Sequence, residues 1–212
     1  MTRKKNKIIV LGGGGHARVL IDLIKTSGKY EIMGILDKKL KTGSSQVGIA
    51  VLGKDNLLSE LYKKGCKNAC IGVGSVKENR KREALFLKVK KAGYSIPCLI
   101  HPSAFVSKET AIFEGVQIMA GAIVQAGCQI EENTLINTGA IIEHDCIIGK
   151  HVHICPGTVI SGGCIIGDGV FIGASATIIQ GTKIGRNAFI GAGSVVVNDI
   201  KAGKKVKGVP AK

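Results

Sequence analysis

The chain has 212 residues, which is enough for one large domain or two small ones. Its aromatic content is only 4% and it has no Trp, which is low for a conventional globular core. The formal charge is +15, yet only four of the 30 Lys and Arg residues lie between Ser103 and Ile200. The basic flanks carry neither a row of aromatic residues nor a known nucleic-acid motif, so we expect no nucleic-acid partner. The positive charge of these flanks suits the binding of phosphorylated small molecules. The alternative is a solvated basic surface that binds no ligand.

Seven cysteines without a C-x-x-C pair favour a reducing compartment. The apolar run from Ile8 to Gly15 is too short and too rich in glycine for a membrane span or a signal peptide. We therefore expect a cytoplasmic protein with no membrane span.

The chain begins with a pattern of strand, glycine loop and helix. A buried strand is predicted over residues 7–11, and a helix over residues 17–26. Between them, Gly12, Gly14 and Ala17 satisfy the G-x-G-x-x-A pattern of a phosphate-binding loop. A second strand over residues 32–36 ends in Asp37, a position that commonly receives ribose hydroxyls. The alternative is a tight turn between strand and helix that binds nothing.

The next elements complete a Rossmann-like α/β domain. Helices are predicted over residues 57–64 and 78–91, a third strand over 68–73, and a fourth over 94–100, interrupted by Pro97. The loop Gly72–Ser75 follows the third strand, at the edge of an open α/β sheet where ligands bind. The first domain is therefore predicted to span residues 1–101.

A six-residue repeat dominates the rest of the chain. From Val106 to Val196 every sixth residue is Ile or Val, in sixteen consecutive positions, and Gly recurs three residues after many of them. A helix cannot produce this period, whereas short strands joined by turns can. We predict a parallel β-helix of triangular coils over residues 102–212, ending in a tail. Cys128, Cys146 and Cys164 are one coil apart, so we expect an inward ladder of small core side chains.

Four segments resemble one family. They are the loop Gly12–His16 (G-G-G-G-H), H-P-S-A at 101–104, N-T-G-A-I-I-E-H-D-C-I-I-G at 137–149, and G-V-P-A-K at 208–212. Together they are similar to the sialic acid O-acetyltransferase/NeuD-like acetyltransferases, which include the bacillosamine and perosamine N-acetyltransferases. The resemblance implies a left-handed β-helix, a homotrimer and acetyl-CoA as co-substrate without a metal. The implied acceptor is a nucleotide-linked sugar, expected to be a UDP-4-amino-4,6-dideoxy sugar in a bacterial surface-glycan or glycoprotein pathway.

The resemblance places the catalytic histidine on His144 and its acidic partner on Asp145. Histidine titrates near neutrality, so it can take the proton of an amine or hydroxyl nucleophile, and a carboxylate beside it raises its basicity. His144 stands two residues after the inward-facing Ile142, so we expect its side chain to point out of the core.

The remaining site residues also come from the resemblance. Expected contacts to acetyl-CoA are His153, Gly162, Ala174 and Ala192. Expected contacts to the nucleotide-linked sugar are Gly13, Gly14, Gly15, His16, Asp37, Lys38 and Gly74. His153 lies half a coil after His144, so the two are expected to meet most easily in a cleft between two subunits.

Four other functions remain open. One is O-acetylation of sialic acid. A second is a γ-class carbonic anhydrase with zinc on His144, His151 and His153, although two of these are only two residues apart and the typical ligand spacing is missing. A third is an NAD-dependent oxidoreductase, in which a long solenoid would have no purpose. The last is a non-enzymatic scaffold.

Overall fold

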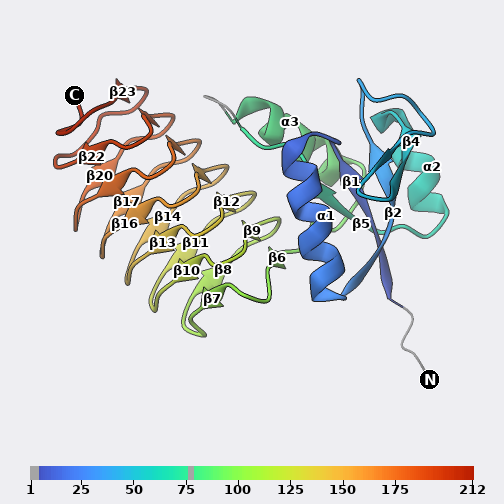
Figure 1. Cartoon of the computed structure of the whole chain (residues 1–212), viewed down its shortest axis with the longest axis horizontal. Helices are drawn as coiled ribbons and strands as arrows, with labels where there is room; N and C mark the ends of the chain where they lie inside the picture. Colours follow the sequence, from blue (N-terminus) through green and yellow to red (C-terminus); the bar gives the residue numbers. More distant parts are fainter. Residues whose placement is uncertain (1–4, 76–78) are drawn as a thin grey trace. The chain divides into compact units, whose positions relative to one another are not determined.

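The computed structural model describes residues 5–75 and 79–212 (Figure 1). The chain divides into two compact units. The first comprises the chain up to Gly74 together with Lys81–Pro97. The second comprises Cys98–Lys212 together with Ser75, Asn79 and Arg80.

The first unit contains a five-stranded sheet. Its strands are β1 (Asn6–Leu11), β2 (Tyr30–Leu36), β3 (Ser45–Gln46), β4 (Ile49–Gly53) and β5 (Asn68–Ile71), in the spatial order β3-β4-β2-β1-β5. The strand β1 lies between β2 and β5 and is parallel to both, and β4 is parallel to β2. The last four residues of β1 are at most 1% exposed, as expected for a parallel strand covered on both faces. The Rossmann-like arrangement is thus confirmed.

Helices cover this sheet. They are α1 (Gly15–Ser27), the 3₁₀ turn η1 (Asp55–Leu57), α2 (Leu58–Lys63) and α3 (Arg80–Lys91). Ile9 and Leu11 of β1 share a buried cluster with residues of α2 and α3, including Leu61 and Phe86. Helix α1 ends where Gly28 adopts φ 65° and donates its N–H to carbonyls of the last turn, a common helix stop.

For this unit the sequence missed one element, and two of its predictions need correction. The hairpin β3–β4 was not predicted, because its turn, Val47–Gly48, lacks the usual Asn-Gly signal although both residues have positive φ. The predicted strand 94–100 is divided: Ser95 makes an isolated bridge to Asn68, whereas β6 (Leu99–Ile100) pairs with β9 of the solenoid. The helix predicted from residue 78 begins at Arg80, and Glu78 itself lies outside the described residues.

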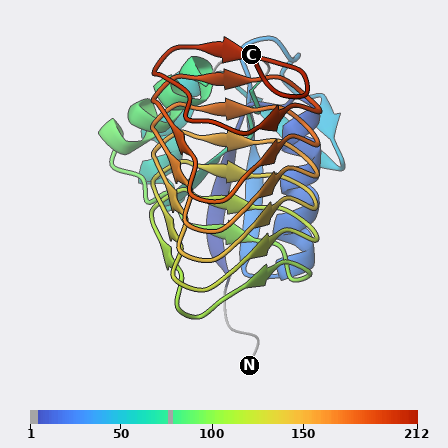
Figure 2. The ribbon, with the colours of Figure 1, turned by 90° about the vertical axis from the view of Figure 1, so that its left-hand side faces the viewer.

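The second unit is the predicted β-helix, built from two-residue strands. They are β7 (Phe105–Val106), β8 (Ala111–Ile112), β9 (Gln117–Ile118), β10 (Ile123–Val124), β11 (Gln129–Ile130), β12 (Leu135–Ile136), β13 (Ile141–Ile142), β14 (Ile147–Ile148), β15 (His153–Ile154), β16 (Val159–Ile160), β17 (Ile165–Ile166), β18 (Phe171–Ile172), β19 (Thr177–Ile178), β20 (Lys183–Ile184), β21 (Phe189–Ile190), β22 (Val195–Val196) and β23 (Lys205–Val206). Figure 2 shows them stacked as parallel rungs.

The strands form three parallel sheets, which we call faces. The first face is β7-β10-β13-β16-β19-β22, the second is β8-β11-β14-β17-β20, and the third is β6-β9-β12-β15-β18-β21-β23. We call the turns between them corner 1–2, corner 2–3 and corner 3–1. Each strand pairs with the strand one coil, or eighteen residues, further on, as Ile142 does with Ile160. Residues eighteen apart therefore form columns along the solenoid.

The period changes once, in the last coil. Ile184 bridges Ile200, and Phe189 pairs with Lys205, so this coil has sixteen residues. The two missing residues belong to corner 1–2, directly after β22. The inward residues stay in register, with Ile190 paired to Val206, because a change of two residues preserves the alternation of inward and outward side chains.

The solenoid interior is filled by the repeating Ile and Val residues. From Ile118 to Val196 they are at most 2% exposed, and they form one continuous cluster. Cys128, Cys146 and Cys164 belong to that cluster with exposures of 1%, 0% and 0%, which confirms the inward cysteine ladder.

The packing of the solenoid interior predicts a graded loss of stability at Ile154, which is fully buried in β15. We expect Ile154→Val to lower the free energy of unfolding by about 0.5–1.5 kcal/mol and Ile154→Ala by about 2–5 kcal/mol, because each removes apolar volume that neighbouring coils cannot refill. Urea denaturation of the three proteins measures both. Equal, small effects of the two substitutions would contradict a packed interior at this coil.

Candidate active site

His144 and Asp145 occupy corner 1–2, in the turn between β13 and β14. Their side chains are 57% and 72% exposed, so His144 points out of the core as predicted. The ring Nδ1 of His144 lies 2.8 Å from Oδ2 of Asp145. In the neutral ring, Nδ1–H donates to the carboxylate, which leaves the lone pair of Nε2 directed to solvent.

The backbone of Asp145 adopts a conformation that normally requires glycine. Its φ is 59°, and the equivalent positions one coil away on either side are Gly127 and Gly163, both with positive φ. Asp tolerates this left-handed region better than most residues, but still at some cost. A Cβ added at Gly127 would collide with the carboxylate of Asp145, so the glycine below gives the acid its space.

Gly162 gives the ring of His144 its space in the same way. It stands one coil above His144, and a Cβ built on it would lie 2.5 Å from Nε2 and 2.6 Å from Cε1 of the ring. Any side chain at this position would displace the imidazole. The structure thus gives Gly162 a contact with His144 itself, in addition to the coenzyme contact expected from the sequence.

The electrostatics of the pair favour a basic imidazole. The hydrogen bond that Nδ1–H of His144 donates to Asp145 raises the pKa of His144 above its ordinary value, and the negative charges of Asp145 and Glu143 act in the same direction. Asp145 thus fixes the tautomer, orients the ring and makes Nε2 a better proton acceptor.

His153 lies elsewhere in the solenoid. It is the outward residue of β15 on the third face, yet it is only 4% exposed. Its ring stands edge-on to Phe171 at a centroid distance of 5.3 Å, and its Nε2 lies 3.4 Å from Nδ2 of Asn137. Within one chain, His144 and His153 are therefore not brought together.

The small residues expected to contact acetyl-CoA are divided between two corners. Ala174 and Ala192 are exposed at corner 3–1, one coil apart, whereas Gly162 lies at corner 1–2 beside His144. A single chain therefore presents two partial surfaces, separated by the first face.

A hollow of about 520 Å³ opens at corner 1–2, further along the solenoid than Gly162. Its lining is Ile179, Gln180, Gly181, Thr182, Val197, Asn198 and Asp199. It lies where the last coil is two residues short, so the shortened turn leaves space there. Gln180 continues the column of His144 and Gly162, and Asn198 lines the same hollow from the shortened turn. Neither was singled out from the sequence, although counting eighteen residues forward from Gly162 gives Gln180.

The first unit has its own cavity, of about 440 Å³, at the carboxyl ends of β1, β2, β4 and β5. Its lining is Leu11, Gly12, Leu36, Asp37, Lys38, Lys39, Asp55, Val73, Lys81, Ala84, Leu85 and Lys88. Asp37 and Lys38 were predicted. Asp55, Lys81 and Lys88 were not, although the last two lie two helical turns apart on α3 and so share one helix face.

Asp37 ties the glycine loop to the end of β2. Its Oδ2 accepts the N–H of Gly13 at 2.8 Å, and its Oδ1 accepts those of Lys39 at 2.7 Å and Leu40 at 3.0 Å. Partial burial acts to raise the pKa of Asp37, but these backbone donors outweigh it, so the pKa lies below its ordinary value. The carboxylate therefore stays ionised and keeps part of its accepting capacity for a ligand hydroxyl.

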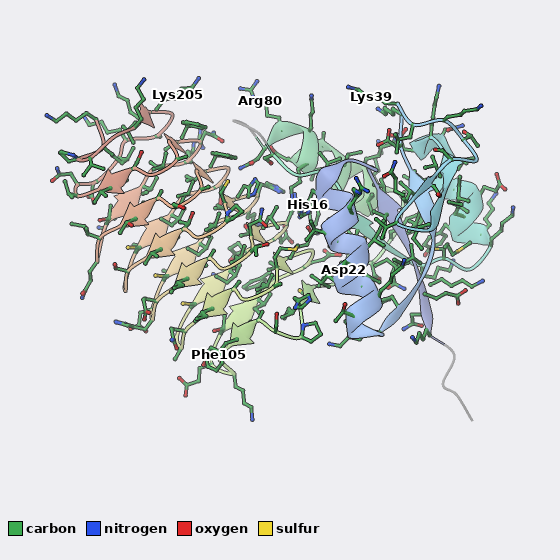
Figure 3. The ribbon with its side chains drawn as sticks, viewed as in Figure 1. His16, Asp22, Lys39, Arg80, Phe105 and Lys205 are labelled. Carbon is green, nitrogen blue, oxygen red and sulfur yellow. The ribbon has the colours of Figure 1, made fainter. Side chains whose placement is uncertain are left out.

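Gly14 and Gly15 leave the amino end of α1 open. Gly14 is the N-cap of the helix, and a Cβ at either glycine would have no atom within 4 Å. Gly13 instead packs against Leu40, where a Cβ would collide with the leucine side chain. A Cβ at Gly74 would lie 3.2 Å from that of His16, the second residue of α1, which Figure 3 labels. The predicted nucleotide-binding residues thus gather at one edge of the sheet.

Asp55 forms an ion-pair network inside this cavity. Its Oδ2 lies 2.5 Å from Nζ of Lys88 and 3.6 Å from Nζ of Lys38, and its side chain is 12% exposed. Burial acts to raise the pKa of Asp55, but the hydrogen bond and charge of Lys88, helped by Lys38, lower it below the ordinary value. The network leaves the cavity rim rich in positive charge.

The histidines considered for zinc do not converge within the chain. His144 lies at corner 1–2, His151 at corner 2–3 and His153 on the third face. Among residues 5–75 and 79–212, no three His, Cys, Asp or Glu side chains form a metal-binding group. None of the helices in this described part of the chain is long and apolar enough to cross a membrane.

Comparisons with known proteins match both units. The family described as PglD N-terminal domain matches residues 7–89, and bacterial transferase hexapeptide repeats match residues 127–162 and 163–198. A perosamine N-acetyltransferase from Caulobacter crescentus, solved with CoA and GDP-perosamine, is 35% identical with a TM-score of 0.92, covering 98% of this chain and 96% of that one. The acetyltransferase domain of PglB from Neisseria gonorrhoeae, solved with acetyl coenzyme A, is 36% identical with a TM-score of 0.89, covering 99% of both chains.

A curated relative extends the comparison. The UDP-N-acetylbacillosamine N-acetyltransferase of Bacillus subtilis is 34% identical over 115 residues. That alignment covers 53% of this chain and 51% of the relative, so it spans about half the length of each protein.

The hydrogen bond between His144 and Asp145 predicts a pKa change that NMR can measure. Because Asp145 raises the pKa of His144, Asp145→Asn should lower that pKa toward the ordinary histidine value of about 6.5. Glu143→Gln is the matched control: Glu143 acts through charge alone, so its loss should lower the pKa less. The ring C–H resonance, assigned with His144→Gln, reports the titration. An unchanged pKa in Asp145→Asn would show that the pair does not form in solution.

Proposed function

Because this chain belongs to the family of hexapeptide-repeat sugar acetyltransferases with a PglD-type N-terminal domain, we propose that it transfers acetyl from acetyl-CoA to an amino group of a nucleotide-linked sugar. The observation that carries the proposal is the pair of His144 and Asp145, exposed at corner 1–2 with Nε2 of the histidine free to accept a proton. Acetyl transfer to an amine needs such a base, because the nitrogen must lose a proton as it bonds to the acyl carbon.

Each residue of the corner has a defined task in this reaction. The Nε2 atom of His144 accepts the proton of the amino group, and Asp145 stabilises the imidazolium that forms. Gly162 leaves the ring in place and allows a ligand to approach it closely. Acetyl-CoA supplies the acetyl group as a thioester: the amine nitrogen bonds to the acyl carbon, the C–S bond breaks, and the leaving CoA thiolate takes up the proton held by the imidazolium, which restores neutral His144.

The second unit fits acetyl-CoA along its corners. The hollow lined by Gln180 and Asn198 continues the column of His144 and Gly162, so an extended arm can lie along corner 1–2 with its reactive end at the histidine. Basic side chains of the last coil, Lys205 among them, project into solvent and suit the coenzyme's phosphates (Figure 3). Ala174 and Ala192 offer small, exposed contacts at corner 3–1, and His153 is expected to meet the coenzyme from the adjacent third face.

The first unit fits the nucleotide. The open amino end of α1 at Gly14 and Gly15 suits a diphosphate, Asp37 suits the ribose, and Lys38 adds positive charge to the cavity. The Bacillus relative is named for a UDP-sugar and the Caulobacter relative was solved with a GDP-sugar. We retain a UDP-4-amino-4,6-dideoxy sugar as the proposed acceptor, in a bacterial surface-glycan or glycoprotein pathway. O-acetylation of a sialic acid is the alternative.

We further propose that the chain works as a homotrimer in the cytoplasm. The two partial surfaces at corners 1–2 and 3–1 complete one site if corner 1–2 of one subunit faces corner 3–1 of the next. The first and second faces also carry outward apolar side chains that suit burial between subunits, including Phe105, Ile147 and Ile165 at 55%, 44% and 41% exposure. All seven cysteines are free thiols, which suits a reducing compartment.

The function is tested by assaying acetyl transfer from acetyl-CoA to UDP- and GDP-linked 4-amino sugars. We expect His144→Ala to lower kcat by about 10² to 10⁴-fold, the usual contribution of a positioned base. Acetyl-CoA binding, measured by calorimetry, should change little, because the base acts on the acceptor's proton. Normal turnover in His144→Ala would show that the nucleophile loses its proton to another group.

The shared site is tested by mixing two inactive variants. His144→Ala disables corner 1–2, and Ala192→Trp is expected to obstruct corner 3–1. In co-refolded mixed trimers, about one quarter of the sites combine two intact surfaces, so about one quarter of the wild-type activity should return. Each variant refolded alone is the control. If the mixture remains as inactive as its components, the site does not span two chains; sedimentation reports the trimer independently.

A further inference from the structure

A column of hydrogen-bond donors runs inside the solenoid beneath corner 1–2. It consists of the residues two places before each inward residue of the second face: Thr110, Cys128, Cys146, Cys164 and Thr182. Every member carries an O–H or S–H group. The equivalent columns at the other corners are mostly Ala and Val: Ala104, Ala122, Ala140, Thr158, Ala176 and Ser194 at corner 3–1, and Val116, Thr134, Val152, Val170 and Ala188 at corner 2–3. Packing alone does not require a donor in every coil.

The donors bond to the backbone of the next coil. Each of the first four reaches the carbonyl oxygen fifteen residues ahead, at the start of the following corner 1–2. The pairs are Thr110 to Gln125 at 3.0 Å, Cys128 to Glu143 at 3.1 Å, Cys146 to Ser161 at 3.3 Å and Cys164 to Ile179 at 3.1 Å. The cysteines are at most 1% exposed, so water does not compete for these bonds.

The carbonyl that Cys128 holds belongs to the peptide unit of His144. The C=O of Glu143 and the N–H of His144 share one rigid plane, so fixing the oxygen also fixes the direction in which the histidine side chain leaves the backbone. Two further bonds hold this turn: Asp145 N–H to Ala126 O at 3.0 Å, and Gly163 N–H to His144 O at 2.8 Å.

The backbone matters here because little else supports the ring. His144 is 57% exposed, and its neighbour in the next coil, Gly162, has no side chain to pack against it. The partner Asp145 is itself 72% exposed and stands on the same turn. The position of Nε2 therefore depends on how firmly the turn is held from inside.

We propose that Cys128 is a positioning residue for His144: its thiol donates to the Glu143 carbonyl and thereby holds the turn that aims Nε2 at the acceptor. This inference rests on the proposed function of His144 as the base. It assigns the thiol no contact with substrate and no chemistry of its own.

Three variants test the proposal. Cys128→Ala removes the donor, and Cys128→Ser restores a donor of similar size. We expect Cys128→Ala to lower kcat about tenfold, since a misplacement of about 1 Å can cost up to about 10²-fold. Its KM values should stay within about twofold, and Cys128→Ser should recover kcat to within about threefold of wild type. Thr134→Val is the matched control: it removes a buried donor to the Gly149 carbonyl, 2.7 Å away at corner 2–3, and should lower Tm while leaving kcat unchanged.

A second measurement separates this inference from the proposed function. In the NMR titration, Cys128→Ala should lower the pKa of His144, because a loosened turn weakens the bond to Asp145. Cys128→Ser should restore that pKa, because it restores the donor without a thiol that could act through its charge, and Thr134→Val should leave it unchanged. This readout needs no substrate, so it is valid even if no acetyl acceptor is found. Wild-type kcat and an unchanged His144 pKa in folded Cys128→Ala would overturn the proposal. Equal kcat losses in Cys128→Ser and Cys128→Ala would do the same, because the thiol would then contribute volume only.

Discussion

The backbone hydrogen bonds between successive coils determine which side chains stand above one another in the second unit. Glu143 N–H donates to Ile160 O at 2.9 Å, and the next strand pair along the chain repeats the pattern, with Ile147 N–H to Cys164 O at 2.9 Å. This ladder fixes a register of eighteen residues, so that side chains far apart in sequence stand one above another. His144 meets Gly162 for this reason, and the carboxylate of Asp145 has space over Gly127 for the same reason.

The two units hold their acidic side chains in opposite ways. Asp37 has both oxygens occupied by backbone donors and belongs to the framework of its loop. Asp145 is exposed to solvent, and its carboxylate accepts a hydrogen bond from the imidazole of His144. The first arrangement gives a fixed negative charge at the rim of a cavity. The second leaves a carboxylate whose main effect is on the basicity and tautomer of one neighbour.

The solenoid was predictable from sequence because every hexad repeats the same signal, so an error in one repeat is corrected by the others. The first unit has no such redundancy. Its hairpin was missed because Val47 and Gly48 form a tight turn without the usual residues, and Leu99 was placed in the wrong sheet because a short strand after Pro97 suits either unit. Of the site, His144 and Asp145 came from family resemblance. The cavity residues Asp55 and Lys88 come together only through folding, since they are 33 positions apart.

The sixteen-residue last coil shows that one coil of this solenoid can lose two residues at a corner and still pair with the coil before it. A corner can lose two residues, because both neighbouring strands then keep their inward side chains inward. A change of one residue that shifted a strand would turn that strand over and expose its Ile, so the turn must absorb it. Whole coils of eighteen residues can be duplicated or removed with no change of register. Insertions and deletions in homologous chains should therefore be confined to corners or span complete coils of eighteen residues, because both leave the Ile and Val side chains of every strand inside the prism.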